Sequence, residues 1–463
     1  MEESFDIIIV GAGPVGIYLA ISLAKNQNSV LIIERDSREI TGSKMDQFHL
    51  ESMVFDKYAI PPPIEGTDEF ITRFEYTSYY GPHGKYQQIM KYPVTAMRFQ
   101  FFIQRLIGIA EESKVKFEFS TEYKEPIINK NHLVGLKVNQ QGKIKELYGK
   151  LIVDATGTSA VVRTSLPNDF GVENFKIKDD EKMYVIQRVI QWKKPEEDHP
   201  GTGEYEGSIS WIYYKTWLAP HFLPNAKIFG GGQPGGYENQ EKATAIFLKD
   251  VPFPPFDILE VHKATTAYRR APYSLIGNGF LCIGDSACMS KSFSGEAIES
   301  SWNASLIATE VINNLLKQDI QLTQENLWQI NVQYFRNRGA KLAALLAQIP
   351  GAANTTEKDV SYMFKHNFIF SGRDFTSMWE NLELEISLWR MLKIIGLFLW
   401  GLITKQFSKK ALATMLKYMK ISGKIRKLYE QFPVNVNEFE KWVERAEDLW
   451  NQVEKMKFNL ITE

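Results

Sequence analysis

The first thirty-four residues constrain the fold of this chain most strongly. The run Asp6-Ile7-Ile8-Ile9-Val10 predicts a buried strand, and the glycine-rich sequence GAGPVG at residues 11–16 follows at once. Apolar residues at helical spacing occupy residues 17–24, and a second apolar run at residues 30–33 ends in Glu34. This order of strand, glycine turn, helix, strand and acid is typical of a βαβ unit that binds a dinucleotide, with the acid accepting hydrogen bonds from a ribose. The alternative is a glycine turn with a purely structural role.

Each glycine of this unit has its own expected role. Gly11 makes the tight turn, Gly13 lets the backbone approach a pyrophosphate, and Gly16 lets helix and strand pack closely. Pro14 and Val15 lie between them at the start of the helix, whose free N–H groups and partial positive charge favour phosphate. All five residues are therefore expected to contact the cofactor.

Composition narrows the class of protein further. A net charge of −1 gives no indication of nucleic-acid binding, and 463 residues suffice for two or three lobes around a large core. The seven histidines form no metal-binding pattern, and Cys282 and Cys288 lack metal or redox spacing, so we expect no metal and a reducing compartment. No signal peptide is visible before the first strand, which predicts a cytoplasmic protein.

The nucleotide-binding fold is interrupted along the chain. It begins at the N-terminus, gives way to strand-rich sequence, and is completed near residues 272–312. This arrangement is typical of a two-domain FAD enzyme. We therefore predict an α/β fold, with an FAD-binding Rossmann-type domain, an inserted and mostly antiparallel substrate-domain sheet, and a C-terminal helical region. The expected boundaries are 1–75, 98–165 and 272–318 for the FAD-binding domain, 76–97 (a hairpin) and 166–271 for the substrate domain, and 319–463 for the helical region.

Two further motifs follow buried strands. DATGTSAVVR occupies residues 154–163, and GDSA at residues 284–287 is followed by SGEA at residues 294–297. Asp285 would lie at the carboxyl edge of the sheet, where it could accept hydrogen bonds from the ribityl hydroxyls of a flavin. The helix after Gly295 would direct its N–H groups at the flavin's N1–O2 edge, which becomes negative on reduction. The alternatives are a helix N-cap for Asp285 and a turn residue for Asp154.

Together these motifs resemble the p-hydroxybenzoate hydroxylase-like FAD superfamily. Within it, the chain looks most like the geranylgeranyl reductase family, of the archaeal digeranylgeranylglycerophospholipid type. Trp217-Leu218-Ala219-Pro220 resembles the family's WxFP stretch, and segments 334–341 and 428–433 also have counterparts, so the resemblance covers most of the chain. The family's cysteine under the flavin is missing from residues 42–47, and Lys291-Ser292 stands where the family has Asn-Pro.

The resemblance implies FAD as cofactor and a set of residues that hold it. For the arginine that touches the FAD phosphates, the family pattern fits either Arg98 or Arg105, and Arg98 is slightly favoured. The full expected set is Gly11, Gly13, Pro14, Val15, Gly16, Glu34, Arg35, Lys44, Met45, Arg98, Tyr123, Asp154, Gly157, Gly284, Asp285, Gly295, Glu296 and Ala297.

The resemblance also implies a reaction. The enzymes of this family saturate isolated double bonds of isoprenoid chains, which requires a proton donor, a hydride from reduced flavin N5 and a dry apolar tunnel. Glu296 is the first candidate for the acid, because it follows the glycine beside the flavin. Tyr213, Trp217 and Pro220 are expected to line the tunnel, although ordinary sheet packing would also explain them. The electron donor stays open between reduced ferredoxin, another reduced flavoprotein and NADPH.

A basic, apolar segment near the C-terminus points to lipid. Residues 394–403 are unbroken apolar sequence, which is too short to span a bilayer. Seven lysines and an arginine follow between Lys405 and Lys427, with no acid before Glu430. We expect an interfacial region that docks on anionic lipid, peripheral on the inner face of the cell membrane. The alternative is a buried helix followed by a solvated basic face.

Two other functions use the same scaffold. One is a flavin-dependent monooxygenase or halogenase acting on an apolar substrate, although the WxWxIP stretch usual in halogenases is absent. The other is a non-catalytic lipid-binding protein that keeps FAD as a structural group.

Overall fold

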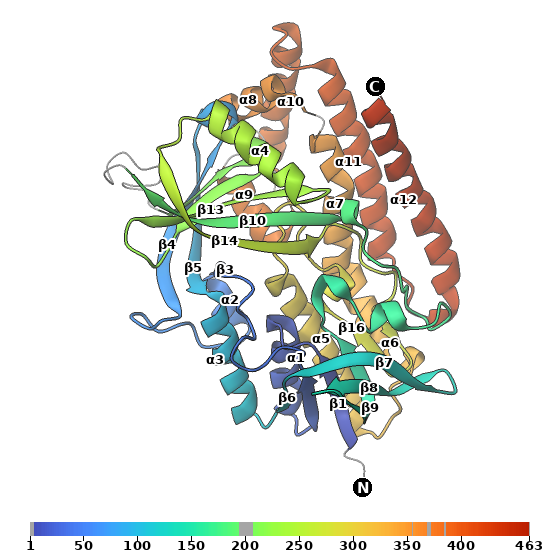
Figure 1. Cartoon of the computed structure of the whole chain (residues 1–463). Coiled ribbons are helices and arrows are strands. Elements are labelled where there is room, and N and C mark those ends of the chain that lie inside the picture. Colours follow the sequence, from blue (N-terminus) through green and yellow to red (C-terminus); the bar gives the residue numbers. More distant parts are fainter. Residues whose placement is uncertain (1–3, 194–206, 354, 368–371, 384–385, 463) are drawn as a thin grey trace.

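The computed structural model describes residues 4–193, 207–353, 355–367, 372–383 and 386–462. Two eight-stranded sheets and a set of C-terminal helices make up the molecule (Figure 1). Among the described residues, no helix combines the length and the apolar character needed to cross a bilayer. Nor do three or more His, Cys, Asp or Glu side chains of the described part come together as metal ligands would.

The first sheet is the nucleotide-binding one, and its centre is parallel. Residues 7–9 and 31–32 are at most 1 % exposed, because helices and strands cover both faces of a central parallel sheet. Ile7 pairs with Val30 on one side and Leu151 on the other. The strands in order are β15 (Ile276–Gly277), β16 (Phe280–Cys282), β9 (Lys143–Asp154), β1 (Ser4–Val10), β2 (Val30–Ile33) and β6 (Lys116–Glu118), with β8 (His132–Gln140) and β7 (Thr121–Asn129) branching antiparallel from β9.

The second sheet is curled and almost entirely antiparallel. One face packs aromatic and aliphatic side chains such as Trp211 and Phe229 against Phe247 of helix α4. Its strands in order are β14 (Phe256–Ala267), β10 (Lys182–Trp192), β13 (Ala226–Pro234), β12 (Thr216–Pro220), β11 (Gly207–Trp211), β4 (Phe70–Tyr80), β5 (Gln88–Arg98) and β3 (Gln47–Glu51). The expected boundary between residues 75 and 76 falls inside β4, and β3 belongs to this second sheet although it lies within residues 1–75.

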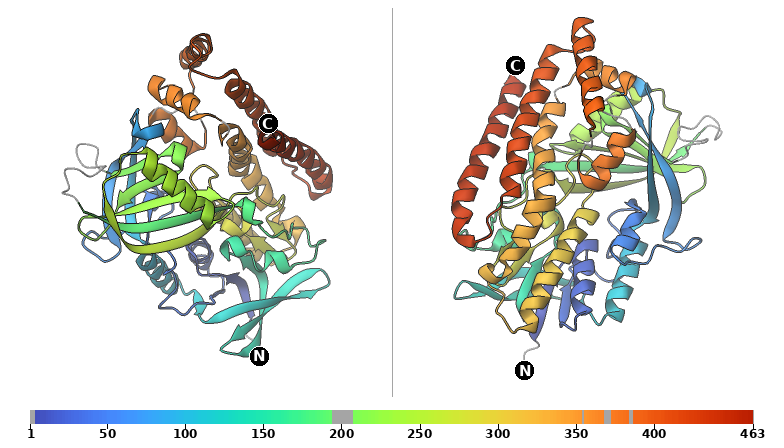
Figure 2. Two further views of the ribbon diagram at one scale, coloured as in Figure 1. Left: turned by 45° about the horizontal axis from the view of Figure 1, so that its top comes forward. Right: turned by 180° about the vertical axis from the view of Figure 1, so that it is seen from behind.

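The helices fall into two groups (Figure 2). Helix α1 packs against α3 and α5, on the nucleotide-binding sheet, whereas α11 packs against α7 and α12. A separate apolar cluster joins strands β4 and β5 to helices α8, α10 and α11. The helices are α1 (Pro14–Ala24), α2 (Met53–Lys57), α3 (Phe99–Glu112), α4 (Tyr237–Asp250), α5 (Ile298–Lys317), α6 (Gln324–Tyr334), α7 (Ala340–Ala353), α8 (Glu357–His366), α9 (Gly372–Asn381), α10 (Leu388–Ile403), α11 (Lys409–Glu430) and α12 (Phe439–Thr462).

Candidate functional site

A cavity of about 1,490 Å³ connects the two sheets to the C-terminal helices. It exceeds the roughly 300–1,000 Å³ of ordinary small-molecule pockets, so it has room for more than one molecule. One end is formed by the glycine loop between β1 and α1, and the other by apolar side chains of α10 and α11. Those side chains are Ile394, Phe398, Leu412, Met415, Leu416 and Met419.

The glycine loop has the geometry of a dinucleotide cradle. Gly11 has φ +106°, and a Cβ there would lie 2.6 Å from the Ala155 carbonyl oxygen. A Cβ at Gly16 would lie 2.4 Å from the Gly11 carbonyl oxygen. The helix and the strand can therefore come this close only because residue 16 has no side chain. A Cβ at Gly13, by contrast, would meet no atom within 4 Å, although this residue lines the cavity. The loop therefore leaves open space where Gly13 faces the cavity.

Glu34 ties this loop to the second strand. Its carboxylate accepts hydrogen bonds from the backbone N–H of Ala12, at 2.8 Å, and of Asp36, at 3.0 Å. The residue also lines the cavity. Glu34 thus holds the glycine loop in place and presents its remaining lone pairs to whatever occupies the cavity.

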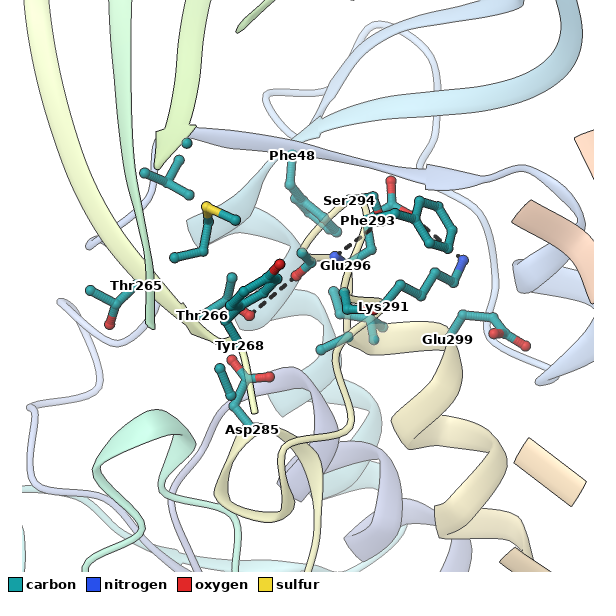
Figure 3. Close-up of a pocket in the computed structure, with 18 of the residues that line it drawn as sticks. Phe48, Thr265, Thr266, Tyr268, Asp285, Lys291, Phe293, Ser294, Glu296 and Glu299 are labelled. Atoms are coloured by element: carbon teal, nitrogen blue, oxygen red, sulfur yellow. Dashed lines mark hydrogen bonds and ion pairs between the residues drawn. The ribbon is translucent and has the colours of Figure 1, made fainter. Parts of the chain in front are cut away.

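Asp285 carries the clearest sign of a missing polar partner. Its Oδ1 is buried and has no hydrogen-bond partner within the part of the chain that the structure describes. Burial raises the pKa of this carboxyl to about 6. Figure 3 shows Asp285 beside the loop that carries Lys291, Ser294 and Glu296. A hydroxyl-rich ligand that donates to Oδ1 would remove the cost of the orphaned oxygen, so the residues present fit the ribityl chain of FAD.

Most of the other expected residues also line the cavity. Lys44 is paired with Asp36 at 2.9 Å, and the Tyr123 hydroxyl lies 2.6 Å from that of Ser165. Trp217 lies flat along the backbone at Gly230, where a Cβ would lie 2.2 Å from the indole. The expected residues that line the cavity are Gly11, Gly13, Pro14, Val15, Glu34, Arg35, Lys44, Met45, Tyr123, Gly157, Gly284, Asp285, Gly295, Glu296, Ala297, Tyr213 and Trp217.

Four of the expected contact residues lie outside the cavity wall, namely Gly16, Arg98, Asp154 and Pro220. The Arg98 guanidinium is held 4.4 Å from the ring centre of Phe101 and 4.3 Å from that of Phe222. The carboxylate of fully buried Asp154 accepts bonds from the backbone N–H of Thr156 and of Arg163, so it shapes its own turn. Here the turn-residue alternative describes the position better.

Pro220 also lies outside the wall, and its carbonyl accepts a 2.6 Å hydrogen bond from the Gln47 side chain. Its neighbour Ala219 lines the cavity instead. Arg105, the other candidate for a phosphate contact, forms a two-pronged ion pair with Glu69 and also lies outside the wall. Arg105 is therefore no better placed than Arg98 to contact the FAD phosphates.

Sequence reasoning singled out Glu296 but missed the three side chains grouped with it, His49, Glu51 and Lys291. We call these four side chains the ion cluster. The Lys291 Nζ lies 2.8 Å from Glu51 Oε1 and 3.5 Å from Glu296 Oε2, and only 1 % of the lysine side chain is exposed. The His49 Nε2 lies 3.3 Å from Glu296 Oε1. All four residues line the cavity. The available signal was a histidine and a glutamate two residues apart in a short strand, together with a lysine between two serines shortly after the GDSA motif.

The ion cluster sets the charge of Glu296. Burial raises its pKa, but the Lys291 charge and the His49 hydrogen bond outweigh this and bring the pKa to about 2. The carboxyl is therefore ionised at neutral pH and has no proton of its own to give. The role of Glu296 as the acid stays a prediction, and one that the ion cluster makes harder to sustain.

The chain is similar in sequence to known flavoproteins. Residues 6–222 match the family described as FAD dependent oxidoreductase. The digeranylgeranylglycerophospholipid reductase of Sulfolobus acidocaldarius is 24 % identical over 98 % of this chain and 99 % of its own length. Digeranylgeranylglycerophospholipid reductase 1 of Methanococcoides burtonii is 23 % identical over 69 % of this chain and 77 % of its own.

Solved structures share the fold. A geranylgeranyl bacteriochlorophyll reductase-like protein from Thermoplasma acidophilum superposes with a TM-score of 0.62 at 12 % identity, over 98 % of this chain and all of that one. A flavin-dependent brominase superposes with a TM-score of 0.60 at 15 % identity, over 91 % of this chain and all of that one. These likenesses confirm the predicted p-hydroxybenzoate hydroxylase-like architecture.

Fold, glycine loop and family match together make this chain an FAD-dependent oxidoreductase, which confirms the predicted cofactor and enzyme class. Among such enzymes, the chain is a distant relative of the digeranylgeranylglycerophospholipid reductases, along nearly its whole length.

Proposed function

We propose that this protein saturates carbon–carbon double bonds in the geranylgeranyl chains of membrane ether lipids or their precursors. The observation that carries the proposal is the length and character of the cavity. It runs from the glycine loop to the apolar inner faces of α10 and α11, so a long hydrocarbon chain could lie against the cofactor. The distant relationship to lipid reductases supports the same substrate class.

The residues of this chain would bind and orient the reactants. Gly13 and the start of α1 would receive the pyrophosphate, and Asp285 would accept from the ribityl hydroxyls. Bound and reduced, FAD supplies the hydride. The inner faces of α10 and α11 would exclude water from the hydrocarbon, and the ion cluster would hold charge close to the reacting bond. Ferredoxin, another reduced flavoprotein or NADPH would deliver the electrons.

Helix α10 would place the enzyme at an anionic membrane surface, on the inner face of the cell membrane. Its apolar side chains are exposed to an unusual degree: Trp389 by 82 %, Ile403 by 74 % and Leu388 by 65 %. The helix lies at the end of the molecule opposite the N-terminus, beside the lysine-rich α11 (Figures 1 and 2). An apolar face flanked by exposed lysines such as Lys409 suits the boundary between lipid tails and anionic head groups.

The exposed face of α10 gives a direct test by flotation. Wild-type protein is expected to float with vesicles of phosphatidylglycerol, and the double variant Trp389→Glu/Ile403→Glu is expected to float at least tenfold less, because two charges would enter the apolar layer. Ile144→Glu is the matched control, because Ile144 is 62 % exposed on the β-strand side of the molecule. Equal flotation of the double variant and the control would remove α10 from the membrane contact.

The reaction itself is tested by the lipids of a host that makes unsaturated geranylgeranyl ether lipids. Co-expression of this chain with a reducing system is expected to raise lipid masses in steps of two hydrogens, as measured by mass spectrometry. Air-dependent consumption of NADPH with oxygen incorporation into the substrate would instead identify a monooxygenase. Unchanged lipids, with FAD-loaded protein present in the extract, would count against the reductase.

A further inference from the structure

The ion cluster has a feature that binding of FAD does not explain. A lysine with 1 % of its side chain exposed and two carboxylates stand in the wall of an otherwise largely apolar cavity. Burying charges in this way is costly and is retained where the charges serve a purpose. Resting on the function proposed above, we propose that His49 is the acid that protonates the double bond, that Glu296 holds and charges it, and that Lys291 positions Glu296.

The geometry leaves one ring nitrogen of His49 available. Its Nε2 lies 3.3 Å from Glu296 Oε1, which leaves Nδ1 as the ring nitrogen that does not contact Glu296. The side chain is 40 % exposed, and the residue lines the cavity in which substrate would lie. His49 lies within β3 (Gln47–Glu51), and the pairing of β3 with β5 fixes the backbone that carries the ring.

The charges around His49 favour the imidazolium. Burial lowers the pKa of His49, and Lys291 lowers it too, but the hydrogen bond and charge of Glu296 and the charge of Glu51 outweigh both and raise it above 6.5. Burial holds the pKa of Tyr79 on β4 and of Tyr92 on β5 well above 10, so both phenols stay neutral. The charges that act on His49 are therefore two negative ones, on Glu51 and Glu296, and one positive one, on Lys291. A protonated His49 ring brings the sum of these four charges to zero.

The other members of the cluster are worse placed to donate. The Lys291 ammonium is bound to Glu51 at 2.8 Å and lies 3.5 Å from the Trp379 carbonyl oxygen, so it is already engaged by two partners. Glu296 is ionised at neutral pH because its pKa is about 2. The backbone links them as well: the Lys291 N–H donates to the Glu296 carbonyl at 2.8 Å, and the Gly295 N–H donates to the Lys291 carbonyl at 2.7 Å. Any shift of the lysine therefore moves the glutamate.

The chemical balance of the step is simple. The N–H bond of the His49 imidazolium breaks, and its proton adds to the less substituted carbon of the double bond. The hydride from reduced FAD adds to the other carbon, so the alkene is reduced and FAD is oxidised. A neutral imidazole remains, with its Nε2–H held by Glu296, and it regains a proton from water. Because an imidazolium is a weak acid for an alkene, proton and hydride should add together rather than through a free cation.

An NMR titration measures the charge state of His49 independently of the reduction reaction. In holoenzyme labelled with ¹³C at the histidine rings, the signal lost in His49→Gln belongs to His49. Its titration midpoint is expected above 6.5 in wild type and lower in Glu296→Gln, because the carboxylate that favours the imidazolium is then gone. A midpoint at or below 6.5 that does not respond to Glu296→Gln would overturn the inference.

Reduction kinetics complete the test. His49→Gln keeps an N–H donor for Glu296 but has no proton to release, so the rate of lipid reduction at saturating lipid is expected to fall about 10²–10⁴-fold with lipid binding unchanged. The wild-type rate is expected to decline as pH rises through the His49 midpoint, since only the protonated ring donates. Equal rates in wild type and His49→Gln would overturn this inference alone, whereas a wild type that reduces no isoprenoid lipid would overturn the proposed function.

Discussion

Gly13→Val is expected to give a folded protein that no longer retains FAD. The position has φ −77°, which any residue adopts, and a Cβ there meets no protein atom within 4 Å. The valine side chain would instead fill the space where the pyrophosphate must approach the start of α1. We expect the affinity for FAD to fall at least a hundredfold, as measured by titration of the apoprotein with FAD and flavin fluorescence. The free energy of unfolding of the apoprotein should change by only about 1 kcal/mol, through the altered helix N-cap.

Gly16→Ala is the matched control for this variant. Its Cβ would lie 2.4 Å from the Gly11 carbonyl oxygen and 3.1 Å from the Ala155 Cβ, so the damage is to packing. We expect the apoprotein to lose about 1–3 kcal/mol of stability, as overpacked cores do. If Gly13→Val binds FAD as wild type does, the glycine loop is not where the pyrophosphate lies.

Lys291→Met is expected to destabilise the protein by about 3–5 kcal/mol, because it leaves buried carboxylates without their counter-charge. The methionine has nearly the shape of the lysine stem, so the loss measures charge rather than volume. The lysine side chain is 1 % exposed and bonds Glu51 at 2.8 Å. Urea unfolding of the apoprotein at neutral pH would measure the change.

Two variants sharpen this experiment. Lys145→Met removes an ion pair of similar length, with Glu118 at 2.6 Å, but the lysine side chain is 42 % exposed, so the loss should stay below about 1 kcal/mol. Lys291→Met combined with Glu51→Gln should recover part of the stability, because one orphaned charge is then removed. A Lys291→Met protein as stable as the Lys145→Met protein would mean that the ion cluster is not closed to water as the structure has it.

The cofactor half of the molecule was predictable from local pattern. The order of strand, glycine turn, helix, strand and acid specifies one arrangement, since Gly11 and Gly16 answer steric demands of the chain itself and Gly13 leaves space for a ligand. The buried runs at residues 6–10 and 280–283 likewise predict central strands of a parallel sheet. Such signals lie within a few residues of each other and need no knowledge of tertiary contacts.

The substrate half was less predictable, because its contacts join distant segments. The ion cluster brings together β3, at residues 49–51, and a loop at residues 291–296, and neither segment has a pattern that points to the other. Arg98 was expected at phosphate, and its guanidinium lies against two aromatic rings that no local rule foresees, Phe101 and Phe222. Phe222 lies more than a hundred residues away in sequence.

One measurement tests the central claim most directly: a single turnover of reduced, FAD-loaded protein with a geranylgeranyl ether lipid in the absence of oxygen. The account predicts that the visible absorbance of oxidised flavin returns and that the lipid gains two hydrogens for each flavin reoxidised. Flavin that stays reduced in the presence of the lipid, or that reoxidises with no gain in lipid mass, would contradict it.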